Sequence, residues 1–336
     1  MFPPGPPQSV AGRSIAASVR SGTRAATPLT DAAPPAGGSE PLPRRGFLLL
    51  AALTLLWGVN WPMLKLALSE LPVLTFRGTC LFFAGSIIIA LHRALGRSIA
   101  VPRRQWRPLL ITGFFNITVW HLATGFGLVH TTSGRASIIA YTMPIWTVPV
   151  GYLVLGERPG WRRLSALALG SAGLGVLIAT DAQTLGAAPL GPLLVLCGAV
   201  GWACGTVALK RTDWQVSMWV LVGWQCLICG LPIFIAAVAV DAETVRFPSL
   251  WPLVSVIYNI FAPFVICYYL YYEIVRIFPT GVATIGTLGI PMIGLFSGAL
   301  ILGEPLGWSE FTALGLVVAA LAVPVMTRRE SFARGG

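Results

Sequence analysis

Hydrophobic residues fill most of this chain in long runs, which are separated by short segments containing charged residues, proline or glycine. A helix that crosses the hydrocarbon core of a bilayer needs about 20 consecutive apolar residues. Division of the sequence at its polar breaks predicts ten such helices. Their approximate bounds are 47–67, 72–91, 108–129, 133–155, 161–180, 190–209, 215–240, 251–274, 278–302 and 308–327. The pattern therefore predicts an all-α integral membrane protein with ten transmembrane helices.

Two halves of the sequence repeat each other at a nearly fixed displacement. The stretch LGERPGW at 155–161 returns as LGEPLGW at 302–308. Similarly, WGVNWPMLK, which ends at Lys65, corresponds to WACGTVALK, which ends at Lys210. Spans one to five thus recur as spans six to ten. Because each copy has an odd number of spans, the two copies must enter the membrane from opposite sides, which makes an inverted repeat of two five-helix units.

The predicted domain boundaries follow this repeat. Residues 1–45 are rich in Pro, Ala, Gly and Ser and predict a disordered cytoplasmic tail. A transit peptide is the alternative for this segment, since it contains Arg and Ser but few acids. The first five-helix repeat is placed at 46–182, the second at 189–327, and a cytoplasmic C-terminal tail at 328–336.

The charge distribution predicts the orientation in the membrane. Only 10% of the residues are charged, against about 25% in soluble domains, and the net charge is +11. The basic residues gather in the segments on the N-terminal side of the membrane, which the positive-inside rule assigns to the cytoplasm. Both termini are therefore predicted to be cytoplasmic in a multi-pass protein of the cytoplasmic membrane. Since the basic clusters lie between apolar runs, we expect no nucleic-acid partner.

The reactive residue types point away from an enzyme. The six cysteines lie in apolar stretches, where thiols behave as small hydrophobes, and the C-x-x-C of Cys226 and Cys229 is interpreted as packing. The three histidines, His92, His121 and His130, are scattered. No cluster for acid–base or metal chemistry and no P-loop motif is present. We therefore predict no catalytic site, no metal, no cofactor and no ATP hydrolysis by this chain.

Glu157 and Glu304 occupy the same place in the two copies of the LGE motif. Each is predicted to lie in a tight turn just before a helix, where its carboxylate meets the positive end of that helix. Pro159 or Pro305 breaks the preceding helix in each case. Two roles remain open for the pair, a structural one and that of gates which close the two faces in turn.

Ten spans in two halves, together with RG in span two, MP in span four and LGE at its end, resemble the drug/metabolite transporter superfamily. The chain is most similar to the EamA-type transporters, which include exporters of amino acids and other small metabolites. The resemblance covers residues 47–327. It implies alternating access about a central cavity between the halves, without ATP. We therefore expect a small-molecule substrate and contact with membrane lipids.

Candidate substrate contacts are polar or aromatic residues near mid-membrane, where inverted-repeat carriers bind their substrates. Arg77 has two interpretations, snorkelling to the headgroups or binding a substrate carboxylate. His121 is either a packed structural group or a cavity residue. For Asn60 and Asn259, as for Asn116, the alternative is bonding between helices. The aromatic candidates are Trp57, Tyr141, Trp146, Trp202 and Trp224. The run CYYLYYEIVRIF at 267–278 is instead interpreted as an interfacial belt.

The predicted function is secondary transport of small metabolites, in particular export of amino acids or related compounds. A flippase for lipid or lipid-linked sugar is the alternative. Because no Asp or Glu lies near the middle of a span, the transporter is either a facilitator or couples to protons through His121 or a gate carboxylate. One chain contains both halves, and the sequence leaves a monomer and a homodimer open.

Overall fold

The computed structural model describes residues 44–185, 189–277 and 288–333, and this part of the chain is helical and contains no β-strand. The first half comprises α1 (Arg44–Ala67), α2 (Val73–Ala94), η1 (Arg103–Gln105), α3 (Trp106–Gly113), η2 (Phe114–Val119), α4 (Trp120–Val129), α5 (Ser133–Ala140), α6 (Met143–Leu155) and α7 (Trp161–Leu185). The second half comprises α8 (Leu190–Lys210), α9 (Met218–Val240), α10 (Leu250–Phe261), η3 (Ala262–Ile266), α11 (Cys267–Ile277), α13 (Gly289–Leu302) and α14 (Trp308–Ala333).

Eight helical segments of the described residues are long and apolar enough to cross a membrane. Two shorter apolar helices, Gly289–Leu302 and Trp308–Val323, bring the described set to ten. This confirms the predicted all-α membrane fold. Residues 278–287, with which the ninth predicted span begins, lie outside the described residues, as do residues 1–43 of the predicted tail.

The helices at the two ends of the described chain are longer than predicted. Helix α1 begins at Arg44, inside the segment assigned to the N-terminal tail, and α14 continues to Ala333, well past the predicted end of span ten. Between Val325 and Ala333 the sequence has neither glycine nor proline. Its polar residues there are compatible with a helix, so the end of the apolar run does not end the helix.

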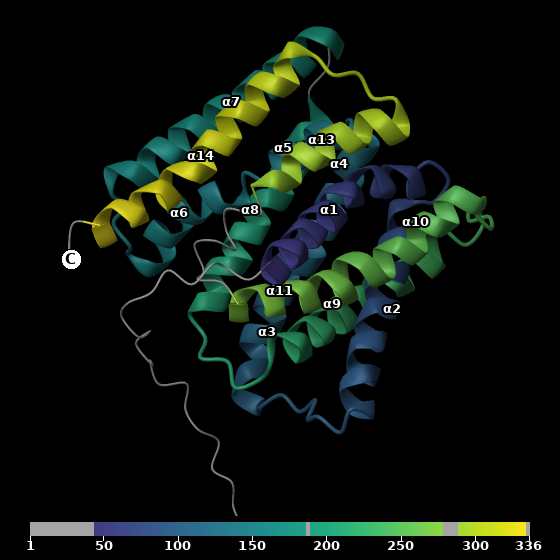
Figure 1. Ribbon diagram of the computed structural model, residues 1–336. Helices are drawn as coiled ribbons and strands as arrows, with labels where there is room; N and C mark the ends of the chain where they lie inside the picture. Colours follow the sequence, from purple (N-terminus) through teal and green to yellow (C-terminus); the bar gives the residue numbers. More distant parts are fainter. Residues whose placement is uncertain (1–43, 186–188, 278–287, 334–336) are drawn as a thin grey trace, which may run out of the picture. The chain divides into compact units, whose positions relative to one another are not determined.

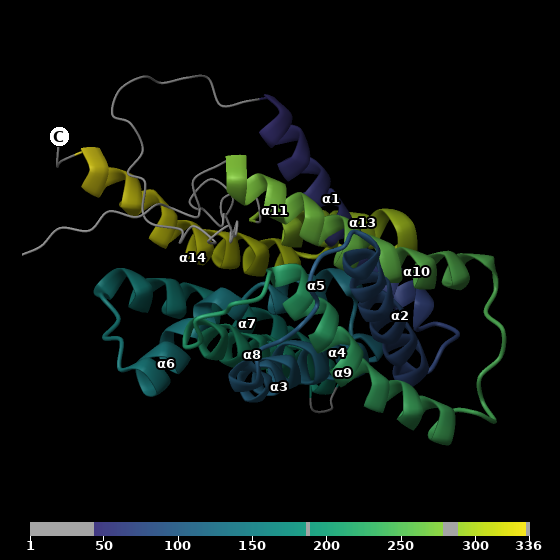
Figure 2. The same cartoon turned by 90° about the horizontal axis from the view of Figure 1, so that it is seen from below.

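The packing of the helices follows the inverted repeat. Helices α2 and α9, which are equivalent in the two halves, pack against each other, and so do α7 and α14 (Figures 1 and 2). Helix α1 packs against α13, α10 and α11, whereas its equivalent α8 packs against α6, α5, α4 and α3. The first helix of each half is thus surrounded largely by spans of the other half. This places α1 and α8 at the interface between the repeats.

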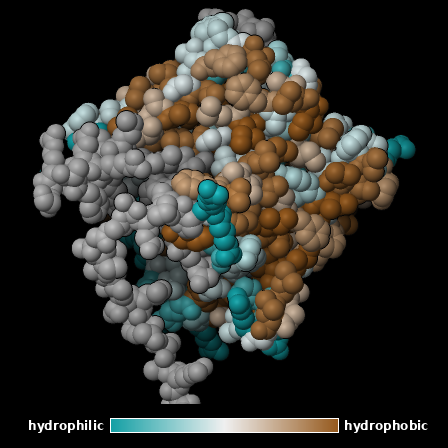
Figure 3. All heavy atoms as spheres, in the orientation of Figure 1, coloured by the Kyte–Doolittle hydropathy of each residue, from teal (hydrophilic) through white to brown (hydrophobic). Residues whose placement is uncertain are grey.

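The surface agrees with a membrane environment. Hydrophobic side chains cover much of the face shown in Figure 3. Large apolar residues such as Leu300, which is 86% exposed, lie on the outside of several helices. Soluble monomers rarely expose contiguous apolar surface on this scale, whereas lipid tails cover it without cost. Together with the ten apolar helices, this makes the chain a multi-pass membrane protein.

Irregular backbone occurs at matching places in the two halves. Span four is interrupted at Tyr141 and Thr142, because Pro144 lacks the N–H that would continue the helix from Ala140. Spans three and eight each contain one π-helical segment, η2 and η3. Such segments often mark functional sites in helices, and here η2 packs against α8 and η3 packs against α1.

Candidate functional site

A cavity of about 130 Å³ lies between the two repeats. Pockets for drug-sized ligands measure about 300–1,000 Å³, so this one suits a small metabolite. Both halves contribute to its wall, through α1, α2, η2 and α4 of the first and α8, α10, η3 and α11 of the second. The lining residues are Trp57, Asn60, Trp61, Leu64, Arg77, Ile117, Trp120, His121, Thr124, Tyr141, Met143, Trp202, Asn259, Pro263, Phe264 and Tyr268.

Several polar atoms at this cavity have no protein partner. Arg77 donates from Nη2 to the hydroxyl of Thr124 at 3.1 Å, whereas its Nε is buried and unpartnered. Asn60 Oδ1 and His121 Nδ1 are also buried without a partner. Buried polar atoms in proteins are nearly always hydrogen-bonded. Three such atoms around one cavity therefore indicate a place for a polar ligand.

Aromatic rings form a continuous wall across the interface of the repeats. Trp120 lies between Trp61, whose ring centre is 6.5 Å away, and Trp202 of the second repeat, at 5.0 Å. On the other side Trp57 meets Tyr268 edge to face at 6.4 Å. The Trp57 indole N–H donates to the carbonyl of Pro263 in η3 at 3.4 Å. The cavity thus combines a small polar region with broad apolar surfaces.

A second hollow, of about 370 Å³, lies towards the end of the bundle that holds Glu157, here called the Glu157 end. It shares three lining residues with the central cavity, namely Trp57, Tyr141 and Met143. Lys210 and Arg163 also line it. Among the described residues, these three side chains border both the central cavity and the hollow at this end.

The opposite end, here called the Glu304 end, has a wider hollow of about 790 Å³. Among the described residues none lines both this hollow and the central cavity. Its walls include Lys65, Arg135, Glu304 and Glu310. The two ends therefore differ, since the central cavity borders the hollow at the Glu157 end and is walled off from the one at the Glu304 end.

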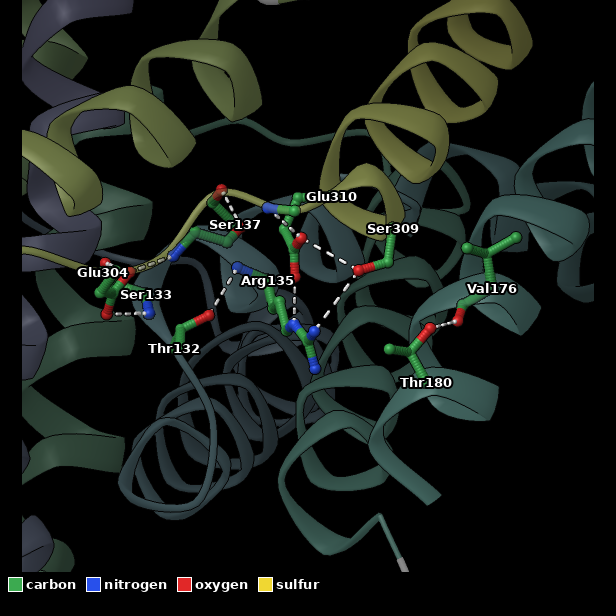
Figure 4. A network of polar contacts seen from close by, with 11 residues as sticks. Thr132, Ser133, Arg135, Ser137, Val176, Thr180, Glu304, Ser309 and Glu310 are labelled. Carbon is green, nitrogen blue, oxygen red and sulfur yellow. Dashed lines mark hydrogen bonds and ion pairs between the residues drawn. The ribbon is translucent and has the colours of Figure 1, made fainter. Parts of the chain in front are cut away.

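Glu304 ties the two repeats together at this barrier (Figure 4). Its carboxylate accepts hydrogen bonds from the backbone N–H groups of Ser133 at 2.6 Å and Gly134 at 3.0 Å. It also accepts one from the Ser133 hydroxyl at 2.8 Å. These N–H groups begin helix α5 and have no partner within it, so a carboxylate placed there is favoured by hydrogen bonding and by the helix dipole.

Lys65 of α1 makes the complementary contact, with helix α4, which precedes α5 in the chain. Its ammonium group donates to the carbonyls of Leu128 at 2.6 Å and Thr131 at 2.9 Å, at the C-terminal end of α4. Beside it, Arg135 of α5 forms an ion pair with Glu310 of α14. Lys65 thus holds the C-terminal end of α4, and Glu304 holds the N-terminal end of α5.

Comparisons with known proteins agree with this architecture. The sequence profile of the EamA-like transporter family matches residues 44–179 and again residues 189–326, one match for each repeat. The chain belongs to the EamA-like transporter family. It is thereby a transporter of the drug/metabolite transporter superfamily, as the sequence motifs predicted.

Several relatives of this EamA-like transporter carry names that describe transport. The uncharacterized transporter YvbV of Bacillus subtilis (strain 168) is 29% identical over 83% of this chain and 91% of its own length. A probable amino-acid metabolite efflux pump of Escherichia coli (strain K12) is 26% identical, over 85% of this chain and 96% of its own. One crystal structure, 22% identical, covers 85% of this chain and 98% of that one with a TM-score of 0.61, which supports the fold.

Within this EamA-like transporter, seven of the nine predicted contact residues line the central cavity. These are Trp57, Asn60, Arg77, His121, Tyr141, Trp202 and Asn259. Arg77 is only 4% exposed and points to Thr124 across the bundle, so it does not snorkel to the headgroups. The side chain of Asn259 lines the cavity and bonds within its own helix, to the carbonyl of Ser255 at 2.9 Å.

Two predicted contact residues do not border the cavity. Trp146 donates to the Thr142 hydroxyl at 3.0 Å and packs against the core. Trp224 donates to the carbonyl of Ile99 at 2.8 Å and packs against Trp106 near the connection between α2 and η1. Their helices are apolar on all sides, so the sequence pattern alone does not show which face meets the cavity.

The structure adds cavity residues that sequence reasoning missed. Trp61 lies one turn beyond Trp57, and Thr124 lies three residues beyond His121, so helical spacing places both on faces already assigned to the site. Tyr268 corrects the interpretation of 267–278 as an interfacial belt, because its ring lines the cavity. The π-helical segment η3 directly precedes it, and the sequence gives no clear sign of that segment.

The prediction for Glu304 also needs correction. The carboxylate does meet a helix N-terminus, but that of α5 in the other repeat and not that of the following helix α14. Glu310 already occupies the start of α14, since it accepts hydrogen bonds from the Gly307 N–H at 2.8 Å and the Ser309 hydroxyl at 3.0 Å. Glu157 is half exposed and pairs with Arg163 at 3.2 Å.

Proposed function

We propose that the protein is a secondary transporter that exports amino acids or related small metabolites across the cytoplasmic membrane by alternating access. The observation that carries this proposal is the central cavity, which both repeats build and which borders the hollow at one end only. Alternating access needs a site between two similar halves that opens to one side at a time. The E. coli relative named as an amino-acid metabolite efflux pump supports the substrate class.

The orientation of this state follows from charge. The segments at the Glu157 end contain most of the Arg and Lys residues, including Arg158, Arg162 and Arg163 beside Glu157 itself. By the positive-inside rule this end faces the cytoplasm, as do both termini. The structure then corresponds to the state in which the substrate enters from inside, which suits an exporter before loading.

The gates in this proposal are the two LGE glutamates. Glu304 closes the outer end by holding the start of α5, and Lys65 assists it by holding the end of α4. When the transporter opens outwards, these contacts break. Glu157 and Lys210 occupy the equivalent positions in the other repeat, and we assign them the same task at the cytoplasmic end in the opposite state.

Coupling to protons and facilitated diffusion both fit this mechanism. His121 lines the cavity and is a candidate for proton uptake, as are the gate carboxylates Glu157 and Glu304. Since one chain contributes both repeats, a monomer is sufficient for the cycle, and a homodimer would contain two independent pathways. The partners in either case are the small-molecule substrate and the surrounding lipids.

The test is counterflow in proteoliposomes of the purified full chain, with amino acids, sugars, nucleosides and drug-like cations as competitors. We expect competition by amino acids. A Thr124→Trp variant should fill the cavity and abolish exchange. The matched control is Ser98→Trp, an equal change at an exposed connection, which should leave exchange intact.

Two results would contradict the proposal. Absence of exchange for the whole panel, with fluorescent lipid scrambled by the same vesicles, would favour the flippase alternative. Equal activity of Thr124→Trp and Ser98→Trp would show that the solute does not pass through the central cavity.

A further inference from the structure

Arg77 is a buried cation without a counter-ion in the described part of the chain. It is 4% exposed, and its contacts in the described chain include the hydrogen bond to the neutral Thr124 hydroxyl and an approach of 5.4 Å to the Phe76 ring. The ion pairs of the described residues involve other arginines, namely Arg45, Arg135 and Arg163. Removing a charge from water without a partner is expensive, so such a group needs compensation.

The guanidinium group borders the central cavity, and its Nε–H has no hydrogen-bond partner in the described chain. Nη2 is engaged with Thr124, whereas Nε is buried and has no acceptor. Gly125 of α4 allows the close approach of Arg77 to this helix, because a Cβ there would lie 3.3 Å from Nε and 2.7 Å from Val73 Cγ1. A planar guanidinium offers parallel N–H groups that match the two oxygens of a carboxylate. The unpaired edge is therefore suited to an acid group in the cavity.

The rest of the cavity narrows the class of ligand. Arg77 is the one charged residue among its described lining residues, so the wall offers a single positive charge and no carboxylate for a ligand cation. A single carboxylate group on the ligand pairs with this charge, whereas a phosphate dianion exceeds it. Trp61, Trp120 and Trp202 provide apolar surface for a hydrophobic body. Asn60 Oδ1 and His121 Nδ1 lack partners and are available to a neighbouring amino or hydroxyl group.

We propose that Arg77 is the carboxylate-binding residue of the central cavity and that the cargo is a small monocarboxylate with an apolar body and an α-amino or α-hydroxyl group. This inference rests on the proposed function, because it names the substrate class of the same site. Recognition depends on the carboxylate first. The α-substituent contributes less, since no acidic side chain of the described lining is present to hold an ammonium group.

The experiment uses two matched probe series on the purified full chain. One series is phenylalanine, 3-phenyllactate, phenylalaninamide and phenethylamine, and the other is the corresponding leucine series. Binding is followed by tryptophan fluorescence of the cavity and by thermal unfolding. The two acids of each series should bind about tenfold or more tightly than the amide and the amine, because only they place two oxygens on the guanidinium.

Substitution of Arg77 should remove this preference. In Arg77→Gln the acids and the amides should bind with similar affinity. Arg77→Lys keeps the charge but loses the paired N–H groups of the guanidinium, so it should retain only part of the preference for acids. Arg97→Gln, an exposed arginine just after α2, is the matched control and should behave like the unaltered protein. If Arg77→Gln does not fold, the probe series on the unaltered protein decides by itself.

The outcomes separate this inference from the proposed function. Binding that does not distinguish acids from amides in the unaltered protein overturns the role of Arg77, even if counterflow is observed. Absence of binding by every acid of both series also overturns it. Tight binding of acids without counterflow supports the site and contradicts transport instead.

Discussion

Among the described residues, the two ends of this bundle differ in their central contacts and agree in their peripheral ones. At the Glu304 end, Glu70 in the α1–α2 turn accepts two hydrogen bonds from Ser249, at the start of α10. At the Glu157 end, Gln105, at the start of α3, donates to the carbonyl of Asp213 in the α8–α9 connection at 2.7 Å. These are equivalent places in the inverted repeat, so the periphery is held at both ends.

Within the described residues, the central contacts lie at the Glu304 end, and positions 280 and 281, which correspond to Ser133 and Gly134 in the repeat, lie outside the described residues. Glu304 and Lys65 hold the ends of α5 and α4, whereas Lys210 is exposed without a hydrogen bond in the described chain and Glu157 pairs only with its neighbour Arg163. We infer that contacts made at both ends maintain the fold. Contacts made at one end define the conformational state.

Local backbone geometry does not cause this difference. Gly156 and Gly303 end α6 and α13 with φ of 68° and 66°, a conformation that favours glycine. The N–H of the following glutamate reaches the carbonyl six residues earlier at 3.4 Å in both copies. The two side chains have different neighbours: Arg163 pairs with Glu157, whereas the equivalent position in the second repeat holds an acid, Glu310, and Glu304 bonds to the start of α5.

Glu304→Ala should produce the largest effect at the closed end. It removes three hydrogen bonds to a charged acceptor, and we expect the closed state to lose about 2 kcal/mol or more. This corresponds to an increase of about 30-fold in the population that opens at that end. Labelling of a Ser137→Cys variant by an impermeant thiol reagent in intact cells measures this opening, because Ser137 is buried behind the contact.

The matched control for this variant is Glu157→Ala. Its carboxylate is half exposed, and the exposed pair with Arg163 is worth little. Labelling at Ser137→Cys should therefore not increase. Equal labelling in both variants would mean that Glu304 does not hold this end closed.

Gly298→Ala and Gly151→Ala form the second pair, since the two glycines are equivalent in the repeat. A Cβ at Gly298 would lie 2.6 Å from both Glu304 Oε2 and Ser133 Oγ, whereas one at Gly151 would meet only Glu157 Oε2, at 3.8 Å. Overpacking costs about 1–3 kcal/mol, so Gly298→Ala should lower the unfolding temperature. Gly151→Ala should leave it equal or raise it, because alanine favours a helix. The unfolding temperatures of the two purified variants are measured. An equal shift in both would contradict this prediction.

The fold was predictable because bilayer thickness and repeat parity leave few solutions. Apolar length located the spans, and the odd number of helices in each copy required inversion. The cavity was predictable in part, since polar residues such as Arg77 and His121 are too costly in lipid to face outwards. Trp224 shows where this reasoning ends, because a helix that is apolar on all sides gives no sign of its rotation.

The partner of Glu304 was not predictable from the sequence. The local motif predicts a carboxylate at a helix N-terminus and leaves open which of the neighbouring helices supplies it. That choice depends on contacts between residues about half the chain apart, such as Glu304 with Ser133. It also depends on which end of an alternating structure is closed, and a single sequence encodes both states.

Lys65→Met should have a smaller effect than the two changes above. It removes the ammonium group from the C-terminal carbonyls of α4, and a cation at such a helix end contributes about 1 kcal/mol. Labelling at Ser137→Cys should rise about fivefold. Lys210→Met, the equivalent change at the exposed position, should leave labelling unchanged. A larger rise with Lys210→Met would reverse the assignment of the closed end.

Glu70→Gln should have the smallest effect, because this carboxylate is exposed and belongs to the peripheral contacts, which have an equivalent at the other end. The hydroxyl and the backbone N–H of Ser249 hold the pKa of the Glu70 carboxyl below its usual range. The stabilisation is therefore present above that range and is lost as the pH falls through the lowered pKa. Thermal unfolding should place the variant slightly below the unaltered protein at about pH 6, and the difference should vanish in acid once the Glu70 carboxyl is protonated in the folded protein. Because the contact is peripheral, labelling at Ser137→Cys should not change, and an increase would place Glu70 among the gating residues.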